Sequence, residues 1–425
     1  MPLLNDHRIV LIEISNIFSC GKTPLNEIID NFYETKISDE IQNKRSETKY
    51  ILSIYCRKLF DLDNIIDQLT ERKISSRNLI VRNCIRLALI ELIYLKNPDY
   101  AVINSWVEIS KNKKRTFHFS KLVNAVLRNF LRKKIKSNLS AIQQIPEWLS
   151  SVWIKDFGEE TTIDIINASL LEPPLDITYK NQLEKNEHLE ILPSSFRIYK
   201  SGKISEIKGY EDGAWWVQDA GATIPAHLFG NIKNKKVLDI CSAPGGKAMQ
   251  LSSMGADVVS VEISKKRIKL MQKNFDRTQL QSTIINQDIL KWNPDEKFEF
   301  ILIDAPCSAT GTIRKNPDLM HIKDATEIDD HISVQMQILE KAKTLTAHNG
   351  TIIYCVCSLQ ANEGINQIES FLSNNKDFQR SKIEIDDYPV YKKFLTEDGD
   401  IQTLPHLIED GGIDGFFISR LYKKV

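Results

Sequence analysis

The second half of this chain alternates short apolar runs with amphipathic segments, and this alternation restricts the fold more than any other sequence feature. From Lys235 onward, six runs have the length and composition of buried strands. The expected strands are Val237–Ile240, Val258–Ile263, Thr283–Asn286, Phe300–Ile303, Thr351–Cys355 and Phe416–Leu421. Strands that alternate with helices form a mainly parallel sheet with helices on both faces, so we expect an α/β domain.

The first ~140 residues have a different pattern, with apolar residues at helical spacing and no strand-like alternation. The clearest helix is expected over Ser76–Leu95, where a serine can cap the start and Pro98 prevents continuation. Further helices are expected over Ala101–Lys111 and Ser120–Lys136. This part is therefore predicted to be all-α.

The length of 425 residues allows two or three domains, at ~100–200 residues per domain. The stretch Pro146–Gly230 lies between the two patterns and has a mixed sequence without a clear helical or strand periodicity. It contains one strand-like run, Ala214–Val217. We expect a helical domain over 1–140, a linker and small mixed α/β subdomain over 141–230, and an α/β domain over 231–425.

The net charge of zero hides an uneven distribution of charge along the chain. Residues 1–150 contain 24 Lys or Arg and 16 Asp or Glu, whereas residues 151–425 contain 32 and 40. The stretch Lys111–Lys136 has ten basic and no acidic residues, which indicates a polyanionic partner. The basic residues of its last predicted helix face either RNA or only solvent. They are Lys121, Arg128, Arg132, Lys133 and Lys134.

Composition argues against several classes of protein and site. No apolar run approaches the ~20 residues that span a bilayer, and Met1–Ser15 lacks the apolar core of a signal peptide. The seven cysteines are odd in number, scattered and without a CxxC pair, so neither a disulfide framework nor a metal site is expected. These features predict a cytoplasmic protein with no membrane partner and no metal.

A glycine-rich turn, CSAPGGK at 241–247, follows the first strand of the alternating part. Such a turn lets the backbone approach a ligand closely at the carboxyl edge of a parallel sheet. Ala248 stands where a phosphate-binding P-loop needs Ser or Thr, and the GxGxxG spacing of a dinucleotide site is missing. The remaining candidate is S-adenosylmethionine, a nucleoside that needs no pyrophosphate cradle.

Acidic residues stand at the ends of successive predicted strands. Glu262 comes 23 positions after Asp239, close to the ~20-residue offset at which a carboxylate contacts ribose hydroxyls. Asp288 and Asp304 follow the next two strands, and Asp288 can accept a hydrogen bond from an adenine amino group. Each alone can be a helix N-cap, but four acids at successive strand ends favour a nucleoside site.

Two cysteines, Cys307 and Cys357, follow predicted strands on the ligand's side of the sheet. A buried cysteine is usually an inert apolar residue, whereas one beside a ligand can be a nucleophile if its pKa is lowered there. A thiolate that adds to carbon 6 of a pyrimidine makes carbon 5 nucleophilic enough to take a methyl group. Amino-group methylation needs no thiol, so the cysteines point to methylation of pyrimidine carbon 5.

In these motifs the alternating part resembles the RNA (cytosine-5) methyltransferase family, which implies a Rossmann-like fold. The matching stretches are Val217–Asp219, LDICSAPGGK at 238–247, DAPCSATGTIRKNPD at 304–318, CVCS at 355–358, LPH at 404–406 and DGFF at 414–417. The helical part resembles the NusB-like RNA-binding fold. Its matching stretches are IRLALIELIYL at 85–95, AVINSWVEISK at 101–111 and KLVNAVLRNFLR at 121–132.

The resemblance implies a role for each motif residue. Cys357 would be the nucleophile and Cys307 would assist release of the enzyme–RNA adduct. Asp304 would hydrogen-bond the flipped cytosine, and Lys247 would line the site. The residues that would surround S-adenosylmethionine are Cys241, Ser242, Ala243, Pro244, Gly245, Gly246, Lys247, Glu262, Asp288 and Asp304. Cys355 stands where the family has a small residue, which implies a packing role.

The pairing of the two parts implies methylation of small-subunit (16S) rRNA at carbon 5 of a cytosine, by a monomer. The RNA would be free or part of an assembling ribosomal particle, and the 141–230 subdomain would contact it. A tRNA substrate remains open, as does a non-catalytic RNA-binding role in ribosome assembly. The sequence departs from the family pattern near the nucleophile, and these departures favour the non-catalytic role. They lie at Val356, Ala361, Asn362 and Gly364.

Overall fold

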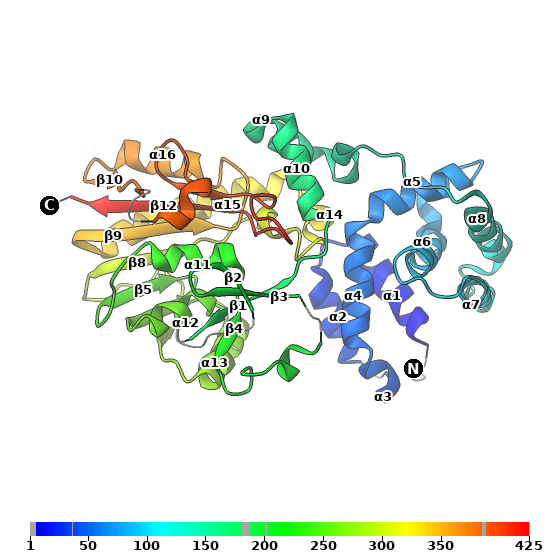
Figure 1. The fold of residues 1–425 in the computed structure, drawn as a ribbon, viewed down its shortest axis with the longest axis horizontal. Coiled ribbons are helices and arrows are strands. Elements are labelled where there is room, and N and C mark those ends of the chain that lie inside the picture. The colour runs from blue at the N-terminus through cyan, green and yellow to red at the C-terminus, as the bar shows by residue number, and fades with distance from the viewer. Residues whose placement is uncertain (1–5, 36, 181–187, 200–201, 385–387, 425) are drawn as a thin grey trace. The chain divides into compact units, whose positions relative to one another are not determined.

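The computed structural model describes residues 6–35, 37–180, 188–199, 202–384 and 388–424. It divides into two compact units, shown as a ribbon in Figure 1. One unit is formed by residues 1–151 with 316–324, and the other by residues 152–315 with 325–425. The first unit is helical, and the second contains both β-sheets.

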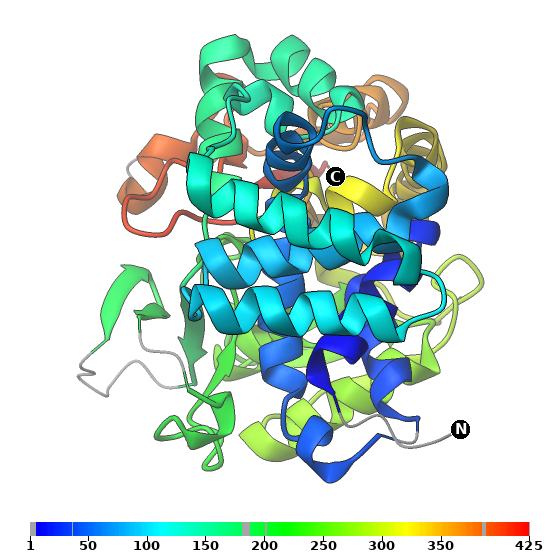
Figure 2. The same ribbon diagram turned by 90° about the vertical axis from the view of Figure 1, so that its right-hand side faces the viewer.

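The helical unit confirms the all-α prediction for the N-terminal part. Helices α6, α7 and α8 lie side by side (Figure 2). The helices of this unit are α1 (His7–Cys20), α2 (Leu25–Tyr33), α3 (Asp39–Gln42), α4 (Arg45–Arg57), α5 (Leu59–Leu69), α6 (Leu79–Ile93), α7 (Asp99–Asn112), α8 (Ser120–Lys133) and α14 (Leu319–Ile322).

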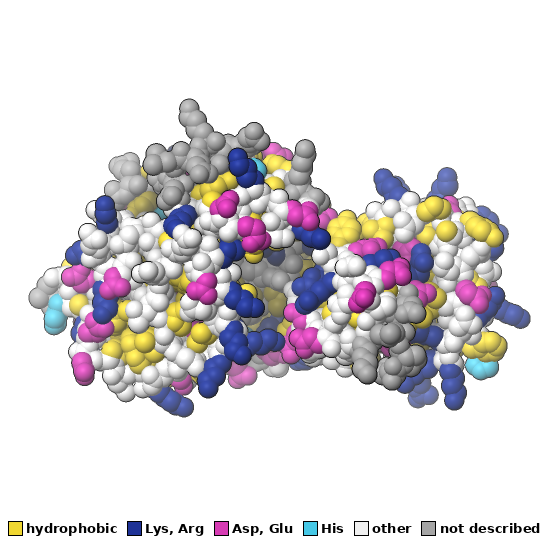
Figure 3. All heavy atoms as spheres, turned by 90° about the horizontal axis from the view of Figure 1, so that it is seen from below, with side chains coloured by type: hydrophobic (Ala, Val, Ile, Leu, Met, Phe, Trp, Pro, Cys, Tyr) yellow, Lys and Arg dark blue, Asp and Glu magenta, His cyan; other side chains and the backbone are white. Residues whose placement is uncertain are grey.

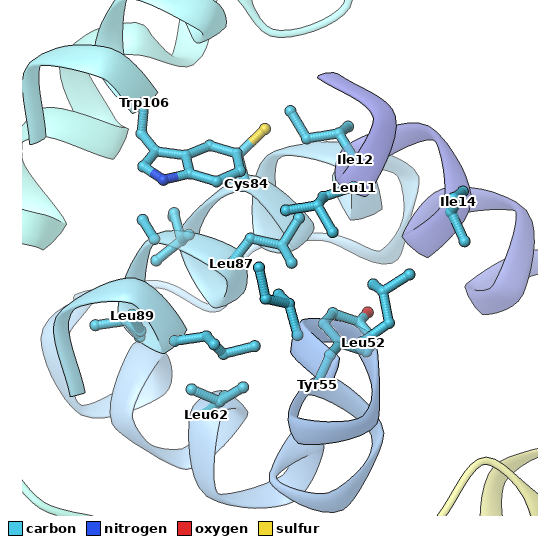
Figure 4. Packing of buried hydrophobic residues seen from close by; sticks show 14 of the residues in the cluster. Leu11, Ile12, Ile14, Leu52, Tyr55, Leu62, Cys84, Leu87, Leu89 and Trp106 are labelled. Carbon is cyan, nitrogen blue, oxygen red and sulfur yellow. The ribbon is translucent and has the colours of Figure 1, made fainter. Parts of the chain in front are cut away.

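Helix α6 is the centre of the helical core because residues all round it are buried. Figure 4 shows Cys84, Leu87 and Leu89 of α6 among apolar side chains from four other helices. Those neighbours include Leu11 and Ile12 of α1, Leu52 and Tyr55 of α4, Leu62 of α5 and Trp106 of α7. A helix surrounded in this way has no polar face for solvent, which explains its nearly unbroken apolar sequence.

Residues 316–324 are distant in sequence from the helical unit but pack within it. Ile322 is only 3% exposed and belongs to the helical core. His321 Nε2 lies 2.7 Å from the carbonyl oxygen of Cys56, and its ring stacks on Phe60. Burial lowers the pKa of His321 to about 4, so the ring is neutral at pH 7. The predicted division into residues 1–140, 141–230 and 231–425 does not place residues 316–324 with the helical part.

Helix α8 is shorter than predicted. It ends at Lys133 instead of Lys136, because Lys134 adopts a left-handed conformation with φ 48° and closes the helix. The sequence signal was misleading because the basic run continues past the end of the helix. No helix in the part of the chain that the structure describes is long and apolar enough to cross a bilayer.

The main sheet of the second unit has strand order β10-β12-β9-β8-β5-β6-β7, with β11 paired to β12. Strands β5 to β9 pair parallel with one another, whereas β12 pairs antiparallel with β9, β10 and β11. All six predicted strands are present, which confirms a mainly parallel sheet. Its strands are β5 (Lys236–Ile240), β6 (Asp257–Glu262), β7 (Thr283–Asn286), β8 (Phe298–Asp304), β9 (Thr346–Val356), β10 (Phe378–Arg380), β11 (Ile401–Thr403) and β12 (Phe416–Lys423).

Helices cover both faces of this sheet because successive strand residues point to opposite sides. Val237 of β5 belongs to an apolar cluster with Phe275 of α13. The next residue, Leu238, belongs to a different cluster with Ile338 of α15 and Phe371 of α16. The α-helices not yet described are α9 (Glu147–Phe157), α10 (Glu159–Ser169), α11 (Ala220–His227), α12 (Gly246–Ser253), α13 (Lys265–Thr278), α15 (Ala325–Leu345) and α16 (Ile365–Asn374).

A second, smaller sheet precedes the main one in the sequence. Its strand order is β2-β3-β1-β4, and every pairing is antiparallel. Only β4 was predicted, as the run Ala214–Val217. The strands are β1 (Leu175–Tyr179), β2 (Leu189–Leu192), β3 (Ser195–Ile198) and β4 (Trp215–Val217). The first three were missed because each contains a charged residue (Asp176, Glu190 or Arg197), which interrupts the apolar run that made β4 recognisable.

Candidate active site

A cavity of about 360 Å³ lies at the carboxyl ends of the parallel strands, where open α/β sheets bind ligands. Its wall combines acidic and thiol groups with the apolar residues Ile263, Ile289 and Leu290. Such a mixture suits a ligand with both a flat apolar part and polar groups. Six residues predicted from the sequence line it, namely Cys241, Glu262, Asp288, Asp304, Cys307 and Cys357.

The other predicted cofactor residues form the turn that begins α12 and are not among those lining the cavity in the described chain. They are Ser242, Ala243, Pro244, Gly245, Gly246 and Lys247. Gly245 has φ 100°, and a Cβ there would lie 2.9 Å from Cγ of Met271. The turn therefore needs this glycine to pack against α13. Direct contact of the turn with a cofactor stays a prediction.

Glu262 is held in place by backbone donors on both sides. It is 3% exposed, and its Oε2 accepts from the Ala243 N–H at 3.3 Å while Oε1 accepts from the Ser264 N–H at 2.9 Å. Arg267 Nη1 lies 3.3 Å from Oε2. A fixed, buried acceptor at the cavity wall can select a hydroxyl donor on a ligand.

Asp288 fits both interpretations of its position. Its Oδ1 accepts from the Leu290 N–H at 3.0 Å, as expected for a residue that caps a local turn. It also lines the cavity and its side chain is 27% exposed, so acceptor capacity remains for a ligand.

Asp239 is a site residue whose importance the sequence did not reveal beyond its place at a strand end. It is fully buried, and neither carboxyl oxygen has a hydrogen-bond partner in the structure. Burial raises the pKa of Asp239 well above its usual range, and Asp304 and Glu262 add to the shift. The carboxyl is therefore neutral unless a cation comes close to it, so this position suits a positively charged ligand.

Lys247 and Asp304 form an ion pair beside the cysteines. The Lys247 Nζ donates to Asp304 Oδ2 at 2.8 Å. Burial opposes the charge, but Asp304 raises the pKa of Lys247 above its usual range, so the amine is a cation. Cys355 and Cys357 are close enough to add to this shift. The predicted residues Lys247, Asp304 and Cys357 are thus brought together.

The two predicted reactive cysteines face each other. Their sulfurs are 3.5 Å apart, and both line the cavity. The hydrogen bond with Cys357 and burial raise the pKa of Cys307 well above its usual range. Cys307 therefore keeps its proton and can donate a hydrogen bond to the Cys357 sulfur. Cys355 is fully buried in β9 with its S–H 3.3 Å from the Ile303 oxygen, in keeping with packing.

Two further motifs quoted from the sequence, around Asp219 and Asp414, meet at buried Arg314. The Arg314 Nε donates to Asp414 Oδ1 at 2.8 Å, and Nη2 donates to Asp219 Oδ2 at 2.6 Å. Lys315 pairs with both carboxylates. The loop that contains Arg314 also contacts the segment just after β9, because the Gly311 N–H donates to the Cys357 carbonyl oxygen at 3.0 Å. This charge network therefore anchors the loop that follows Cys307.

The five predicted RNA-binding residues lie on or next to α8 in the helical unit, and all are exposed. They are Lys121, Arg128, Arg132, Lys133 and Lys134. The spacing of seven and then four residues places the first three on one helix face. None of the five has an acidic partner among the described residues, where Arg128 and Arg132 bond only to asparagines. Dark blue Lys and Arg side chains project from the helical unit in Figure 3.

Comparison with protein-family models gives one match for each part of the chain. Residues 227–422 match the model described as 16S rRNA methyltransferase RsmB/F. Residues 12–132 match the NusB family. Among the residues that the structure describes, no group of three or more His, Cys, Asp or Glu is placed to hold a metal ion.

Individual proteins resemble the chain over most of its length. Ribosomal RNA small subunit methyltransferase B from Pasteurella multocida is 31% identical over 399 residues, which is 87% of this chain and 86% of that protein. The crystal structure of PH0851 matches with a TM-score of 0.76 and 18% identity over 100% of both chains. NSun6 from Pyrococcus horikoshii, solved with SFG, matches with a TM-score of 0.56 and 16% identity over 65% of this chain and 98% of that one. These two structures show likeness of fold alone.

Proposed function

Because the chain belongs to the family of ribosomal RNA small subunit methyltransferases B, with the expected NusB and methyltransferase parts, we propose that it methylates carbon 5 of a cytosine in 16S rRNA. The methyl donor in this proposal is S-adenosylmethionine. The observation that supports the chemistry best is the pair of cysteine sulfurs, 3.5 Å apart, at a cavity on the carboxyl edge of the sheet.

The residues around the cavity fit S-adenosylmethionine. When bound, it supplies an electrophilic methyl group on a sulfonium ion. Glu262 would accept hydrogen bonds from the ribose hydroxyls and Asp288 from the adenine amino group, while Ile263 and Leu290 would pack against the adenine ring. The buried, unpartnered carboxyl of Asp239 supports a cationic ligand, because a positive charge nearby would let it ionise.

Cys357 would start the reaction by adding its thiolate to carbon 6 of a flipped cytosine. The Lys247 cation and the Cys307 S–H lie close to this sulfur and would stabilise negative charge on it during the reaction. Asp304 would hydrogen-bond the base and hold it over the sulfur. Addition at carbon 6 makes carbon 5 electron-rich, so that it takes the methyl group. Loss of the carbon 5 proton then restores the ring and expels Cys357, a step that Cys307 would assist from 3.5 Å away.

The activity test incubates the full chain and labelled S-adenosylmethionine separately with 16S RNA, small-subunit particles and tRNA, all from cells that lack the protein. We expect label at carbon 5 of one cytosine, located by bisulfite sequencing. Label only in tRNA would overturn the rRNA assignment, and label on another base would overturn the cysteine chemistry. Absence of label with RNA and donor binding confirmed would indicate a non-catalytic assembly factor.

The helical unit is proposed to hold the RNA through phosphate contacts from α8. Replacing Lys121, Arg128 and Arg132 by glutamine should reduce the slope of log affinity against log salt by about 2, at ~0.7 per lost contact with single-stranded RNA. Filter binding between ~50 and 200 mM salt measures the slope. A matched variant loses three other exposed basic residues of this unit, Arg72, Arg77 and Lys96, and should keep the original slope. Equal effects of both triple variants would contradict a specific role for α8.

A further inference from the structure

We propose that Glu363 is a positioning residue that holds Cys307 and Cys357 at their reactive separation. Glu363 follows the second cysteine in the sequence but does not line the cavity in the described structure. The inference rests on the proposed function, because it concerns the spacing of the two sulfurs that this function requires.

The side chain of Glu363 joins the two cysteine loops by hydrogen bonds to the residue after each cysteine. The Ser308 N–H donates to Oε1 at 2.8 Å, and the Ser308 hydroxyl donates to Oε2. The Ser358 hydroxyl donates to the same Oε2 at 2.5 Å. The cysteines lie after different strands, β8 and β9, so contacts between their loops are needed to fix the distance between the sulfurs.

Glu363 is itself held rigidly from the opposite side. Gln335 of α15 donates to Glu363 Oε1 at 3.0 Å and to the Pro306 oxygen at 2.9 Å. The Tyr354 hydroxyl donates to the Glu363 carbonyl oxygen at 2.8 Å. Both the backbone and the carboxylate are therefore fixed, which lets the carboxylate act as a reference point for the two loops.

The charge of Glu363 argues against a role in stability alone. The residue is 0% exposed, and in the part of the chain described by the structure its side-chain partners are neutral donors rather than Lys or Arg. Burial of a carboxylate without a cation is costly, and a neutral side chain of the same size would usually serve stability better. What the carboxylate provides here is two acceptor oxygens that bridge Ser308 and Ser358.

The expected fall in kcat follows because reaction rates depend strongly on the distance between the reacting groups. A displacement of ~1 Å between reacting groups can reduce a rate by about 10²-fold. Glu363→Ala should therefore lower kcat by about 100-fold and leave the KM for S-adenosylmethionine within about threefold. Glu363→Gln keeps the size of the side chain and the oxygen that accepts from the Ser308 N–H, and both serine hydroxyls can turn to accept from its amide. This variant should recover kcat to within about threefold of the wild type.

A second readout measures the sulfur separation without activity. Phenylarsine oxide binds two thiols that lie close together, so it should bind the wild type and lose most of its affinity for Glu363→Ala. Cys307→Ala is the control that removes the dithiol. Glu369→Ala is the matched control for the carboxylate, since it removes an exposed glutamate from α16, the helix that begins two residues after Glu363, and it should change neither kcat nor arsenical affinity.

Each result bears on the inference. Wild-type kcat or unchanged arsenical affinity in a folded Glu363→Ala protein would overturn it. If that variant does not fold, the double variant Ser308→Ala/Ser358→Ala decides, with an expected fall of about tenfold in kcat and weaker arsenical binding; no change in either would overturn the inference. If the wild type binds the arsenical but methylates no RNA, the proposed function fails, while loss of binding in Glu363→Ala would still support the positioning role.

Discussion

Cys357→Ala should abolish methyl transfer, whereas Cys307→Ala should leave RNA covalently attached to the protein. Without the Cys357 sulfur, carbon 5 of the base is not activated, so we expect a loss of about 10⁴–10⁶-fold in kcat. Without Cys307, addition and methyl transfer proceed, but the assisted release of the adduct is lost. The 3.5 Å sulfur separation places Cys307 beside the carbon–sulfur bond that must break.

Denaturing gels with end-labelled RNA and S-adenosylmethionine distinguish the two variants. Cys307→Ala should give a band of protein-bound RNA, and Cys357→Ala should give none. Cys355→Ala is the matched control, since Cys355 is buried within β9, two residues before Cys357, and should be dispensable for chemistry. A trapped adduct in Cys357→Ala instead would show that the two roles are reversed.

Arg314→Met should destabilise the protein by about 3–5 kcal/mol, the cost of removing one partner from a buried ionic network. Burial disfavours ionisation of Asp219, but Lys315 and Arg314 hold its pKa below the usual range. Loss of Arg314, which is 1% exposed, would leave Asp219 and Asp414 with Lys315 as their remaining cationic partner. Urea denaturation of the full chain, followed by tryptophan fluorescence, measures the change.

Two further variants test the cause of that loss. Lys235→Met breaks an exposed ion pair with Glu299 in the same unit and should cost less than about 1 kcal/mol. Adding Asp414→Asn to Arg314→Met removes one of the two buried carboxylates and leaves Asp219 paired with Lys315, so it should restore part of the lost stability. If Arg314→Met cost no more than Lys235→Met, the network would have no structural importance.

Periodicity was sufficient to predict the main elements of the fold. The parallel strands other than β7, which lies at the edge of the sheet, are largely buried on both faces, so their sequences are mostly apolar runs that stand out from the surrounding helices. Strands β10 and β11 were missed because each has only three residues. The excursion of residues 316–324 into the helical unit could not be predicted, because its apolar residues form part of a core assembled by distant segments.

The site was predicted less completely than the fold. Strand ends identified the cavity residues Glu262, Asp288 and Asp304, because parallel strands bring their carboxyl ends to one edge. The bridging role of Glu363 had no sequence signal, since it depends on two serines that meet only in the folded chain. The ionic network of Arg314 also had no sequence signal, because Asp219 and Asp414 meet it only in the folded chain.

One departure from the family pattern has a local explanation. A Cβ at Gly364 would lie 2.8 Å from Cγ of Phe417, whose ring packs against this backbone. Glycine is therefore the residue that this arrangement of Phe417 accommodates. The departure at Gly364 is thus a packing adjustment next to Glu363, and it gives no support to a non-catalytic role.

The path of residues 316–324 limits how this protein can be divided for experiments. A fragment ending near residue 151 would lack Ile322, leaving a hole among the helices, and His321 would no longer cover the ring of Phe60. The complementary fragment would expose Leu319 and Ile322 to water. Either half expressed alone should therefore aggregate or unfold at a lower temperature, and co-expression of the two halves should rescue both. The two parts of the chain are expected to depend on each other for folding.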